Sequence, residues 1–592
     1  MSAGLALIAF LPGYALLLAL WPPSAEPSLT GPEQWLIAVP ISYSLTITLF
    51  LFMVFARLPL TLFSVAGGLT ALTLLFTFIA WRSSPLPSPS SSPYLHPPYY
   101  LLPFLAILLS SLFRLVNIHY SDYQGDEADI LLRAVSLGSG HLEAILTHSK
   151  GPGEILLLNA IGALTGRFDE QAARLPFSLA GVVSVGLIVL LGQELFSRSV
   201  GFIAGLLAAI DGVFVSYART AQYQSLVLLL TLTALYCFYR FYQTGSHSRR
   251  WHGLGAFLFA ASFLFHFETI LLLPVVIYLT LVAETRGGEE AKRRRSEEVE
   301  TGGDEEAKRQ NHASRLTPHA SVRSLPLGRL TSLWPSALIF ITLVAAFYLP
   351  FLLHPNVKST GSYLENRIGG GSVPPFNNLA HFFYFEALKY NSAYYVILFN
   401  ALLVLVVVLV LAGVQTKWPG GVARRGQEAR SRGAEEKFLP RPSAPLLLCL
   451  AVVVLVLGGI GFSLLGQAQL AALLLALGFA LFLALVIFSP QTSLPQRILW
   501  LWLAPPFLIY VFLVNRPGKH HYLFLGALTL WVSWVAVQGW QWAAKRWPVL
   551  YQPAGRWLTL GFGAALLAIF AGHSIMLFLR SDLEYVLTYP AH

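Results

Sequence analysis

Long apolar runs recur along the whole chain and constrain its fold more than any other feature of the sequence. A helix needs about 20 predominantly apolar residues to cross the hydrocarbon core of a bilayer. The runs are continuous rather than alternating in polarity, which excludes a transmembrane β-barrel. The sequence therefore predicts an all-α polytopic membrane protein with about sixteen transmembrane helices. Their expected positions are 2–20, 34–55, 60–80, 99–118, 172–195, 200–217, 221–242, 251–266, 268–283, 331–353, 394–413, 445–465, 468–488, 497–514, 521–542 and 557–579.

The composition agrees with a membrane-embedded chain. Of the 592 residues, 55% are hydrophobic and only 11% are charged, against roughly 25% charged residues in an ordinary soluble domain. So much apolar surface would face water in a soluble protein that this class is almost excluded. Two cysteines exclude a disulfide-stabilised scaffold. Cys237 and Cys449 both lie inside apolar runs, where cysteine acts as a small hydrophobic residue.

Lysine and arginine are distributed unevenly between the loops, which orients the predicted helices. Loops 284–330 and 414–444 are rich in both residues, as cytoplasmic loops of membrane proteins are. Threading the spans in order then places 119–168 and 354–392 on the outer side. Loop 119–168 has six acidic and three basic residues, in agreement with that side. Topology thus explains the basic loops, which carry no interleaved aromatic residues, so no nucleic-acid partner is predicted.

Two polar segments divide the chain. Residues 82–98 are rich in Ser and Pro and predict an extended linker. Residues 284–330 mix nine acidic with ten basic residues and predict a disordered cytoplasmic loop. The resulting parts are the N-terminal transmembrane spans 1–81, a transmembrane core 99–283 with the outer loop 119–154, and a C-terminal transmembrane bundle 331–592 with the outer loop 354–392.

The outer loop 119–154 gathers the polar residues best suited to chemistry. Its segment 127–137 has apolar residues at helical spacing and predicts an amphipathic helix on the membrane surface. A second short helix is expected over 141–147. The run Lys150-Gly151-Pro152-Gly153 then breaks the chain before the apolar stretch 155–164, which is short for a span and resembles a re-entrant half-helix.

Asp126 and Glu127 stand at the start of the first amphipathic helix, and two interpretations are open. They cap the helix and complement its dipole, or a carboxylate at the mouth of a membrane cavity acts as a general base. Asp129 follows on the same face, and three such acids offer oxygen ligands to a divalent cation. Acidic first turns are common, so no metal site is predicted here.

Four motifs in order carry a family resemblance. They are Asp126-Glu127, Lys150-Gly151-Pro152, Arg174-Leu175-Pro176 and Tyr217-Ala218-Arg219. The pattern resembles membrane glycosyltransferases of the GT-C superfamily, in the branch of protein O-mannosyltransferases and aminoarabinose transferases, which includes dolichyl-phosphate-mannose-protein mannosyltransferase-like proteins. In that family the second motif has Pro where this chain has Gly151. The resemblance covers roughly 99–283, and beyond 331 it rests on the layout of the spans.

The resemblance implies a GT-C-like fold and a function. Such enzymes move a sugar from a polyprenyl-phosphate carrier to a hydroxyl of a protein, lipid or glycan, on the extracytoplasmic face of the cell membrane. The reaction needs a base, a cationic pocket for the leaving phosphate and a lipid-facing groove for the isoprenoid tail. Asp126 is the expected base, with Glu127 orienting it or a sugar hydroxyl. No cofactor is expected.

The remaining site residues are assigned to two groups. Carrier-phosphate binding is expected from Lys150, Arg219, Lys519, His520 and His521. For Lys150 and Arg219, snorkelling at a span end is an open alternative, and for the two histidines an interfacial anchor is. The substrate cavity is expected to include Tyr123, Pro152, Arg174, His266, Glu268 and Arg367, although His266 and Glu268 equally suit a turn cap.

Three other classes of protein stay open. A lipid or solute transporter explains the spans, but transporters usually carry buried charges at mid-span and paired broken helices, and Asp211 is the main internal candidate here. An oligosaccharide polymerase or ligase shares the carrier, and a non-catalytic membrane scaffold is the third class. The Gly-rich outer loop 354–392 suits a lid over a sugar site, or a plain connector.

Overall fold

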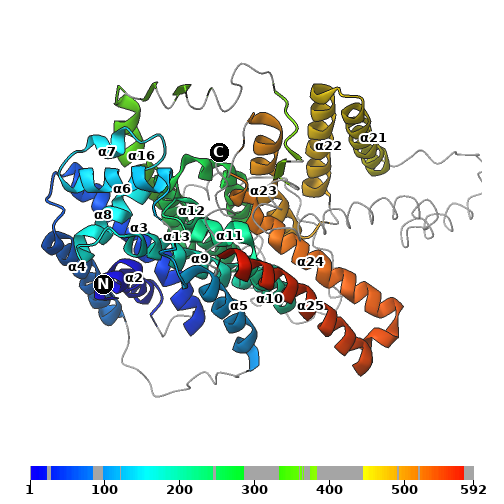
Figure 1. Ribbon diagram of the computed structural model, residues 1–592, viewed down its shortest axis with the longest axis horizontal. Coiled ribbons are helices and arrows are strands. Elements are labelled where there is room, and N and C mark those ends of the chain that lie inside the picture. Colours follow the sequence, from blue (N-terminus) through cyan, green and yellow to red (C-terminus); the bar gives the residue numbers. More distant parts are fainter. Residues whose placement is uncertain are drawn as a thin grey trace, which may run out of the picture. The chain divides into compact units, whose positions relative to one another are not determined.

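A computed structural model gives the fold of the protein (Figure 1). It describes residues 2–22, 29–83, 98–120, 122–244, 249–285, 333–355, 444–489, 492–515 and 520–578, and short pieces at 357–358, 361–362, 365, 374–379, 381–382 and 517. Within these residues all regular structure is helical and no strand occurs, as predicted. The chain forms two compact units, which comprise 1–366, 494–506 and 522–592 in the first and 367–493 and 507–521 in the second.

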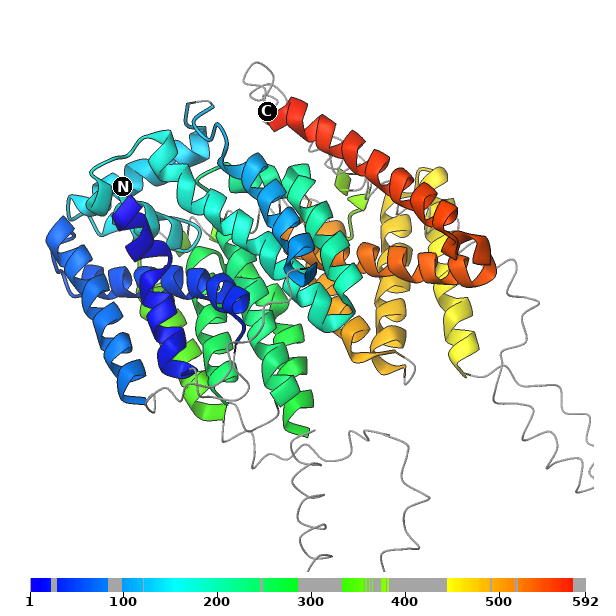
Figure 2. The ribbon, with the colours of Figure 1, turned by 90° about the horizontal axis from the view of Figure 1, so that it is seen from below.

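Four helices open the first unit. Thr30 starts the third of them with a capping box, in which its hydroxyl accepts from the Glu33 N–H and the Glu33 carboxylate accepts from the Thr30 N–H. The second helix packs against both the third and the fourth, and Figure 2 shows α2 and α4 as neighbours. The four are α1 (Ser2–Ala9), α2 (Leu11–Leu20), α3 (Gly31–Phe55) and α4 (Leu62–Ser83).

The outer loop folds into short helices, as predicted. The helix expected over 127–137 is α6 (Gly125–Gly138), which buries Ile130 and Ala134 and leaves Leu132 70% exposed, as an amphipathic surface helix does. Gly140 follows with a φ of +92°, a conformation that favours glycine. The neighbouring helices are α5 (Pro98–Leu115), α7 (Glu143–Leu146) and α8 (Gly153–Thr165), and Figure 1 shows α6, α7 and α8 together.

The core of the first unit is a set of apolar helices that support this loop. Asp169 and Ser197 cap the first two of them by accepting from backbone N–H groups of the first turn. The core helices are α9 (Glu170–Leu195), α10 (Arg198–Ile210), α11 (Gly212–Ala218), α12 (Gln224–Thr244), α13 (Arg249–Phe265), η2 (Phe267–Leu272) and α16 (Trp334–Leu353). α9 packs on α5, α10 and α12, and α13 packs on α12 and α16.

The predicted span 200–217 is not one straight helix. It bends by 61° between α10 and α11. Asp211 begins α11 by accepting from the Phe214 N–H at 2.9 Å, and Arg114 donates to the carbonyls of Ala208 and Ala209, each at 2.8 Å. These bonds satisfy backbone groups that a helix end leaves without partners, which makes a break inside a membrane tolerable. Asp211 and Arg114 thus bind backbone groups at the break. A buried charge inside a span was the main argument for a transporter, and these contacts explain Asp211 without one.

The C-terminal helices belong to both units. α24 (Tyr522–Arg546), η7 (Pro548–Tyr551) and α25 (Pro553–Phe578) lie in the first unit, and α23 (Leu494–Leu508) begins there. The second unit holds α21 (Ala444–Leu464), α22 (Ala468–Phe488) and the π-helical turn η6 (Ile509–Leu513). In it the Asn378 amide donates to the carbonyls of Tyr510, Val511 and Val514, which the irregular turn leaves available.

Ten described helices are long and apolar enough to cross a membrane, or up to eleven when the bent pair α10 and α11 is one span. The protein is therefore a multi-pass helical membrane protein. The predicted number of about sixteen stays a prediction. The runs near 99–118, 251–266, 445–465 and 557–579 correspond to helices that do not meet this criterion, and 394–413 lies outside the described residues. Residues 84–97 of the predicted linker, almost all of loop 284–330 and most of loop 354–392 also lie outside them, and residues 82, 83 and 98 belong to the helices on either side.

Candidate active site

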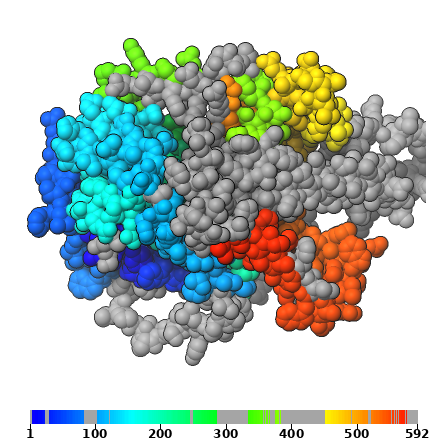
Figure 3. Space-filling model, in the orientation of Figure 1, coloured from blue at the N-terminus to red at the C-terminus, as the bar shows by residue number. Residues whose placement is uncertain are grey.

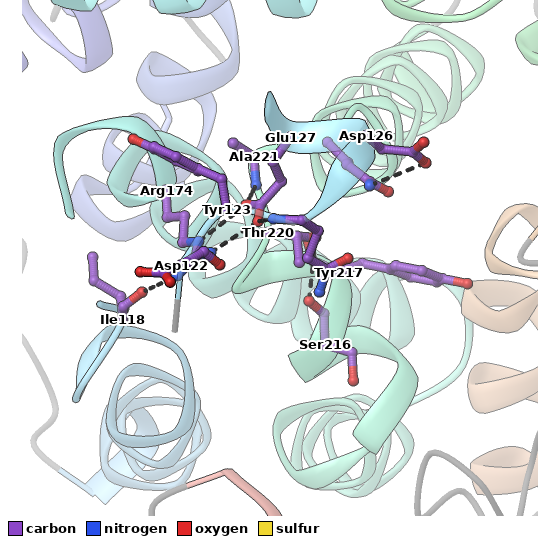
Figure 4. Close-up of polar contacts among 12 residues, drawn as sticks. Ile118, Asp122, Tyr123, Asp126, Glu127, Arg174, Ser216, Tyr217, Thr220 and Ala221 are labelled. Atoms are coloured by element: carbon purple, nitrogen blue, oxygen red, sulfur yellow. Dashed lines mark hydrogen bonds and ion pairs between the residues drawn. The ribbon is translucent and has the colours of Figure 1, made fainter. Parts of the chain in front are cut away.

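Glu127 and Arg174 form a closed ion pair beneath the start of α6 (Figure 4). Both side chains are fully buried, and the guanidinium donates to both carboxylate oxygens, Nε to Oε1 at 3.0 Å and an Nη to Oε2 at 2.8 Å. The same carboxylate accepts from the N–H groups of Ala221 at 2.7 Å and Gln124 at 3.2 Å. Glu127 thereby ties α6 to α9 and to the turn after α11. Glu127 thus fixes the start of α6, which carries Asp126, and the expectation that it orients Asp126 or a sugar hydroxyl stays a prediction.

Arg174 was expected to line the substrate cavity, and that assignment stays a prediction. Its Nη groups donate to the carbonyls of Ile118 at 3.1 Å and Asp122 at 3.0 Å. The guanidinium also lies 5.0 Å from the centre of the Tyr120 ring. Buried charges are stable only when paired and hydrogen-bonded, and this arginine meets both conditions inside the protein. Its role is to hold Glu127 and the chain that leads from α5 to α6.

Arg219 was expected at the carrier phosphate, and the structure gives it a different task. Its side chain is 1% exposed, and its Nη groups donate to the carbonyls of Phe113, Val116 and Asn117 at 2.7–2.9 Å. These carbonyls end α5, where a helix leaves them without partners inside the helix. Arg219 therefore caps α5 through its Nη groups, and its assignment to phosphate binding stays a prediction.

Asp126 differs from its neighbour Glu127 in exposure and in hydrogen-bond partners. Its side chain is exposed and points away from the buried ion pair (Figure 4). Its Oδ2 accepts from the Gln222 amide at 3.3 Å, and the Gln222 amide oxygen accepts from the Gln224 amide at 3.3 Å. Two buried glutamines thus hold one oxygen of an accessible carboxylate. A base needs this combination of accessibility and fixed orientation.

Lys150 lies beside the same turn. Its ammonium group is 4.7 Å from the centre of the Tyr223 ring, within the range of a cation–π contact, and its side chain is half-buried. Tyr223 stacks on His266 with ring centres 4.3 Å apart. The His266 Nδ1 accepts from the Glu268 N–H at 3.2 Å, so the open alternative of a turn cap is what the contacts show for this pair. Through Tyr223, His266 also supports Lys150.

Gly151 explains why this chain departs from the family motif. A Cβ atom at this position would lie 2.0 Å from the carbonyl oxygen of Leu264, so even alanine does not fit. The Gly151 N–H donates to the Phe265 carbonyl at 3.3 Å, a bond that proline cannot make. The turn therefore docks directly on the end of α13. Next to it, Glu154 is fully buried and its Oε1 lies 3.1 Å from Nε2 of the buried His148.

The other predicted site residues are placed as follows. Burial and then the charge of Glu170 raise the pKa of the Tyr123 phenol, which stays protonated and donates to the Phe168 carbonyl at 2.7 Å. Pro152 is buried at the start of α8. Arg367 and Lys519 lie outside the described residues. His520 and His521 belong to the second unit, where His520 stacks on Tyr510 at 5.3 Å and His521 contacts Phe382, and their assignment to the phosphate stays a prediction.

The three acids considered for a divalent cation do not act together. The Glu127 carboxylate is bound by Arg174 and by backbone N–H groups, and Asp129 pairs with Arg133 at 2.9 Å. Among the residues that the structure describes, no group of three His, Cys, Asp or Glu side chains is arranged to hold a metal ion. The geometry around Asp126 therefore gives no support to a metal bound by these acids.

The turn 219–224 between α11 and α12 organises the site, and this role of its residues 221–223 was not predicted from the sequence. Ala221 binds Glu127, Gln222 binds Asp126, and Tyr223 lies under Lys150. The turn follows the motif that ends at Arg219 and was counted largely within the span 221–242. Its polar run Thr220 to Gln224, at the edge of an apolar stretch, was the available signal.

Comparison with known proteins agrees with the motifs. Residues 149–292 match the family model of the dolichyl-phosphate-mannose-protein mannosyltransferases. The matched segment holds Lys150, Arg174 and Arg219, and the match confirms the resemblance predicted from them. The chain is thus a multi-pass membrane protein whose central segment is similar to this family.

Among solved structures, the chain is similar to the crystal structure of the Archaeoglobus fulgidus oligosaccharyltransferase in the apo form. The similarity covers 84% of this chain at 14% sequence identity, with a TM-score of 0.40. It covers 56% of the archaeal protein, so this chain spans little more than half of that protein's length. No curated protein sequence shows a significant match to this chain.

Proposed function

We propose that the protein is an integral-membrane glycosyltransferase, which moves a sugar from a polyprenyl-phosphate carrier to a hydroxyl of a protein, lipid or glycan. One observation carries the proposal. Two consecutive residues of one turn, Gln222 and Tyr223, bind the exposed carboxylate of Asp126 and support the ammonium group of Lys150. A base for the acceptor and a cation for the leaving phosphate therefore lie at the same turn. Lys150 and this turn belong to the segment that matches the mannosyltransferase family.

In the proposed reaction the acceptor oxygen attacks the anomeric carbon of the donor sugar. Asp126 takes the hydroxyl proton as the new C–O bond forms, and the bond between the sugar and the carrier phosphate breaks. The departing phosphate gains negative charge, which the Lys150 ammonium group stabilises. Glu127 and Arg174 contribute by fixing the start of α6, and hence the position of Asp126. No cofactor takes part in this scheme.

An apolar groove supports a lipid-linked donor. It has a volume of about 610 Å³ and is lined by α3 from Thr48 to Phe55, by Phe257 of α13 and by α16 from Leu338 to Pro350. All three helices are apolar, and α3 and α16 are long enough to span a membrane. α13 ends at Phe265, on which the Lys150 turn docks. An isoprenoid tail in this groove would lead toward Lys150.

We further propose that the site faces the outside of the plasma membrane. The contacts are consistent with the orientation derived from Lys and Arg. His354 contacts Glu143 at 3.1 Å, and both segments are expected outside, whereas Arg250 donates to the Leu20 carbonyl, and both are expected inside. Cysteine labelling in intact cells checks this orientation. A cysteine at Ser296 should be protected and one at Ser372 labelled, and equal labelling of both would overturn the topology.

The activity itself is tested with purified protein and a panel of radiolabelled polyprenyl-phosphate sugars, with hydroxyl-bearing peptides, lipids and glycans as acceptors. At least one donor should yield transfer that depends on Asp126. The Asp126→Asn protein is the matched control, because it preserves the shape of the side chain. Transport of an intact lipid-linked sugar without bond cleavage would instead favour a flippase.

A further inference from the structure

Behind Asp126, the buried side chains of Gln222 and Gln224 form a hydrogen-bonded chain that leads into the interior of the first unit. A carboxylate only accepts hydrogen bonds, so the Gln222 amide must present its NH₂ group to Asp126. Its oxygen then faces Gln224, whose NH₂ group must in turn point toward Gln222, as the 3.3 Å contacts describe. The Gln224 oxygen is therefore forced toward the interior. The orientation of both amides follows from the acid at one end.

Gln224, at the interior end of this hydrogen-bonded chain, borders a small cavity. It has a volume of about 10 Å³, and Arg114, Gln224, Ser225 and Tyr522 are among its lining residues. Three polar atoms of these lining residues, Oε1 of Gln224, Nε of Arg114 and Oγ of Ser225, have no hydrogen-bond partner among the described residues. All three residues are at most 4% exposed. A buried polar atom without a partner costs on the order of 1–3 kcal/mol.

These atoms make complementary demands. The Gln224 oxygen requires a donor, and the Arg114 Nε–H requires an acceptor. A water molecule is both, and a cavity of roughly 10–15 Å³ with two to four polar partners holds one. The volume and the polar partners of this cavity meet that requirement.

We propose that this cavity binds one water molecule, which donates to Gln224, accepts from Arg114, and so makes Gln222 and Gln224 positioning residues for Asp126. Arg114 also caps α10 at the break of the bent span. The orientation of the base is thereby anchored to the interior of the first unit rather than to the loop alone. The catalytic part of this inference rests on the proposed function, whereas the water site does not.

Structure determination tests the water site without any activity. A cryo-electron microscopy map at about 2 Å resolution should show a density peak within hydrogen-bonding distance of Arg114 Nε and Gln224 Oε1. Ser225→Val fills the cavity and should remove the peak, whereas Ser225→Ala should keep it. A map that shows other buried waters but no peak here would overturn the proposal.

Kinetics tests the positioning role. Gln224 binds Gln222 rather than Asp126 itself. Gln224→Leu should nevertheless lower kcat about tenfold with the donor KM unchanged, because Gln222 then loses the partner that orients its amide toward the charged Asp126. Gln243→Leu is the matched control, because it makes the same change on α12 at a glutamine bound to Glu194, and kcat should stay the same. Equal kcat values for Gln224→Leu and wild type would refute the role. A wild-type protein that transfers no sugar would refute the proposed function, and the water site would still stand or fall on the map.

Discussion

Charged residues at the outer loop fall into two groups that use the same residue types for opposite purposes. The rim is Asp126 and Lys150, and the buried anchor is Glu127, Arg174 and Arg219. In the buried anchor, every charged group is bound by an opposite charge or by backbone. At the rim, the carboxylate is exposed and the ammonium group is half-buried over an aromatic ring. Adjacent residues in the sequence therefore divide into one that holds the loop and one that is available to a substrate.

A charged residue at a membrane surface can bind a substrate only if the fold leaves it hydrogen-bonding capacity. Arg219 and Lys150 both belong to family-like motifs on the outer side. Carbonyls of Phe113, Val116 and Asn117 accept from the Nη groups of Arg219, whereas the Lys150 ammonium group lies over the Tyr223 ring. Substitutions at the rim should therefore reduce activity, and those in the buried anchor should reduce stability.

The largest effect is expected at Asp126. Asp126→Asn keeps the shape of the side chain but removes the base, so sugar transfer should fall roughly 10²–10⁴-fold while the melting temperature stays the same. Asp129→Asn is the matched control, because Asp129 lies on the same helix and only pairs with Arg133. Transfer assays and thermal unfolding of both variants check the prediction. Near-normal transfer by a folded Asp126→Asn protein would refute the assignment of Asp126 as the general base.

The next effect concerns stability. Arg174→Ala leaves the Glu127 carboxylate buried without its counter-charge, which should destabilise the fold by about 3–5 kcal/mol. Thermal unfolding measures this loss, and Glu127→Leu combined with Arg174→Leu should recover part of it, because no unpaired charge remains. A protein with Arg174→Ala that unfolds normally but transfers no sugar would instead place Arg174 at the substrate.

A smaller effect on activity is expected at Lys150. Lys150→Ala removes one charge-assisted contact with the departing phosphate, worth about 1.5–3 kcal/mol, so transfer should fall more than tenfold with stability unchanged. Arg167→Ala serves as the control, because this outer arginine is paired with Asp169 and stands outside the rim. Normal transfer by the Lys150→Ala protein would show that another cation serves the phosphate.

The smallest effect is expected at Gly151, which separates the rim from the end of α13. Gly151→Pro restores the residue of the family motif, yet its Cβ collides with the Leu264 carbonyl, and the bond to Phe265 is lost. Such overpacking typically costs about 1–3 kcal/mol of stability and displaces Lys150. Measured stability and donor KM report the two consequences. Unchanged values for both would show that the turn adapts freely.

The sequence by itself determined the helical membrane architecture, because continuous apolar runs permit only helices across a bilayer. It also determined the local structure of the outer loop, since α6 follows from apolar spacing and glycines between 125 and 140. The motifs also placed Asp126 and Lys150 in the same polar outer loop.

Only the tertiary structure decided the roles of the individual charges. Glu127 meets Arg174 across 47 positions and Ala221 across 94, and Arg219 reaches α5 across more than 100. No local periodicity records such contacts, because they depend on which helix ends the fold brings together. The same reason hid Gln222 and Tyr223, whose side chains matter only because Asp126 and Lys150 are packed against their turn. Whether a charge is available to a substrate is therefore decided by the carbonyls and amides around it, which the sequence places far away.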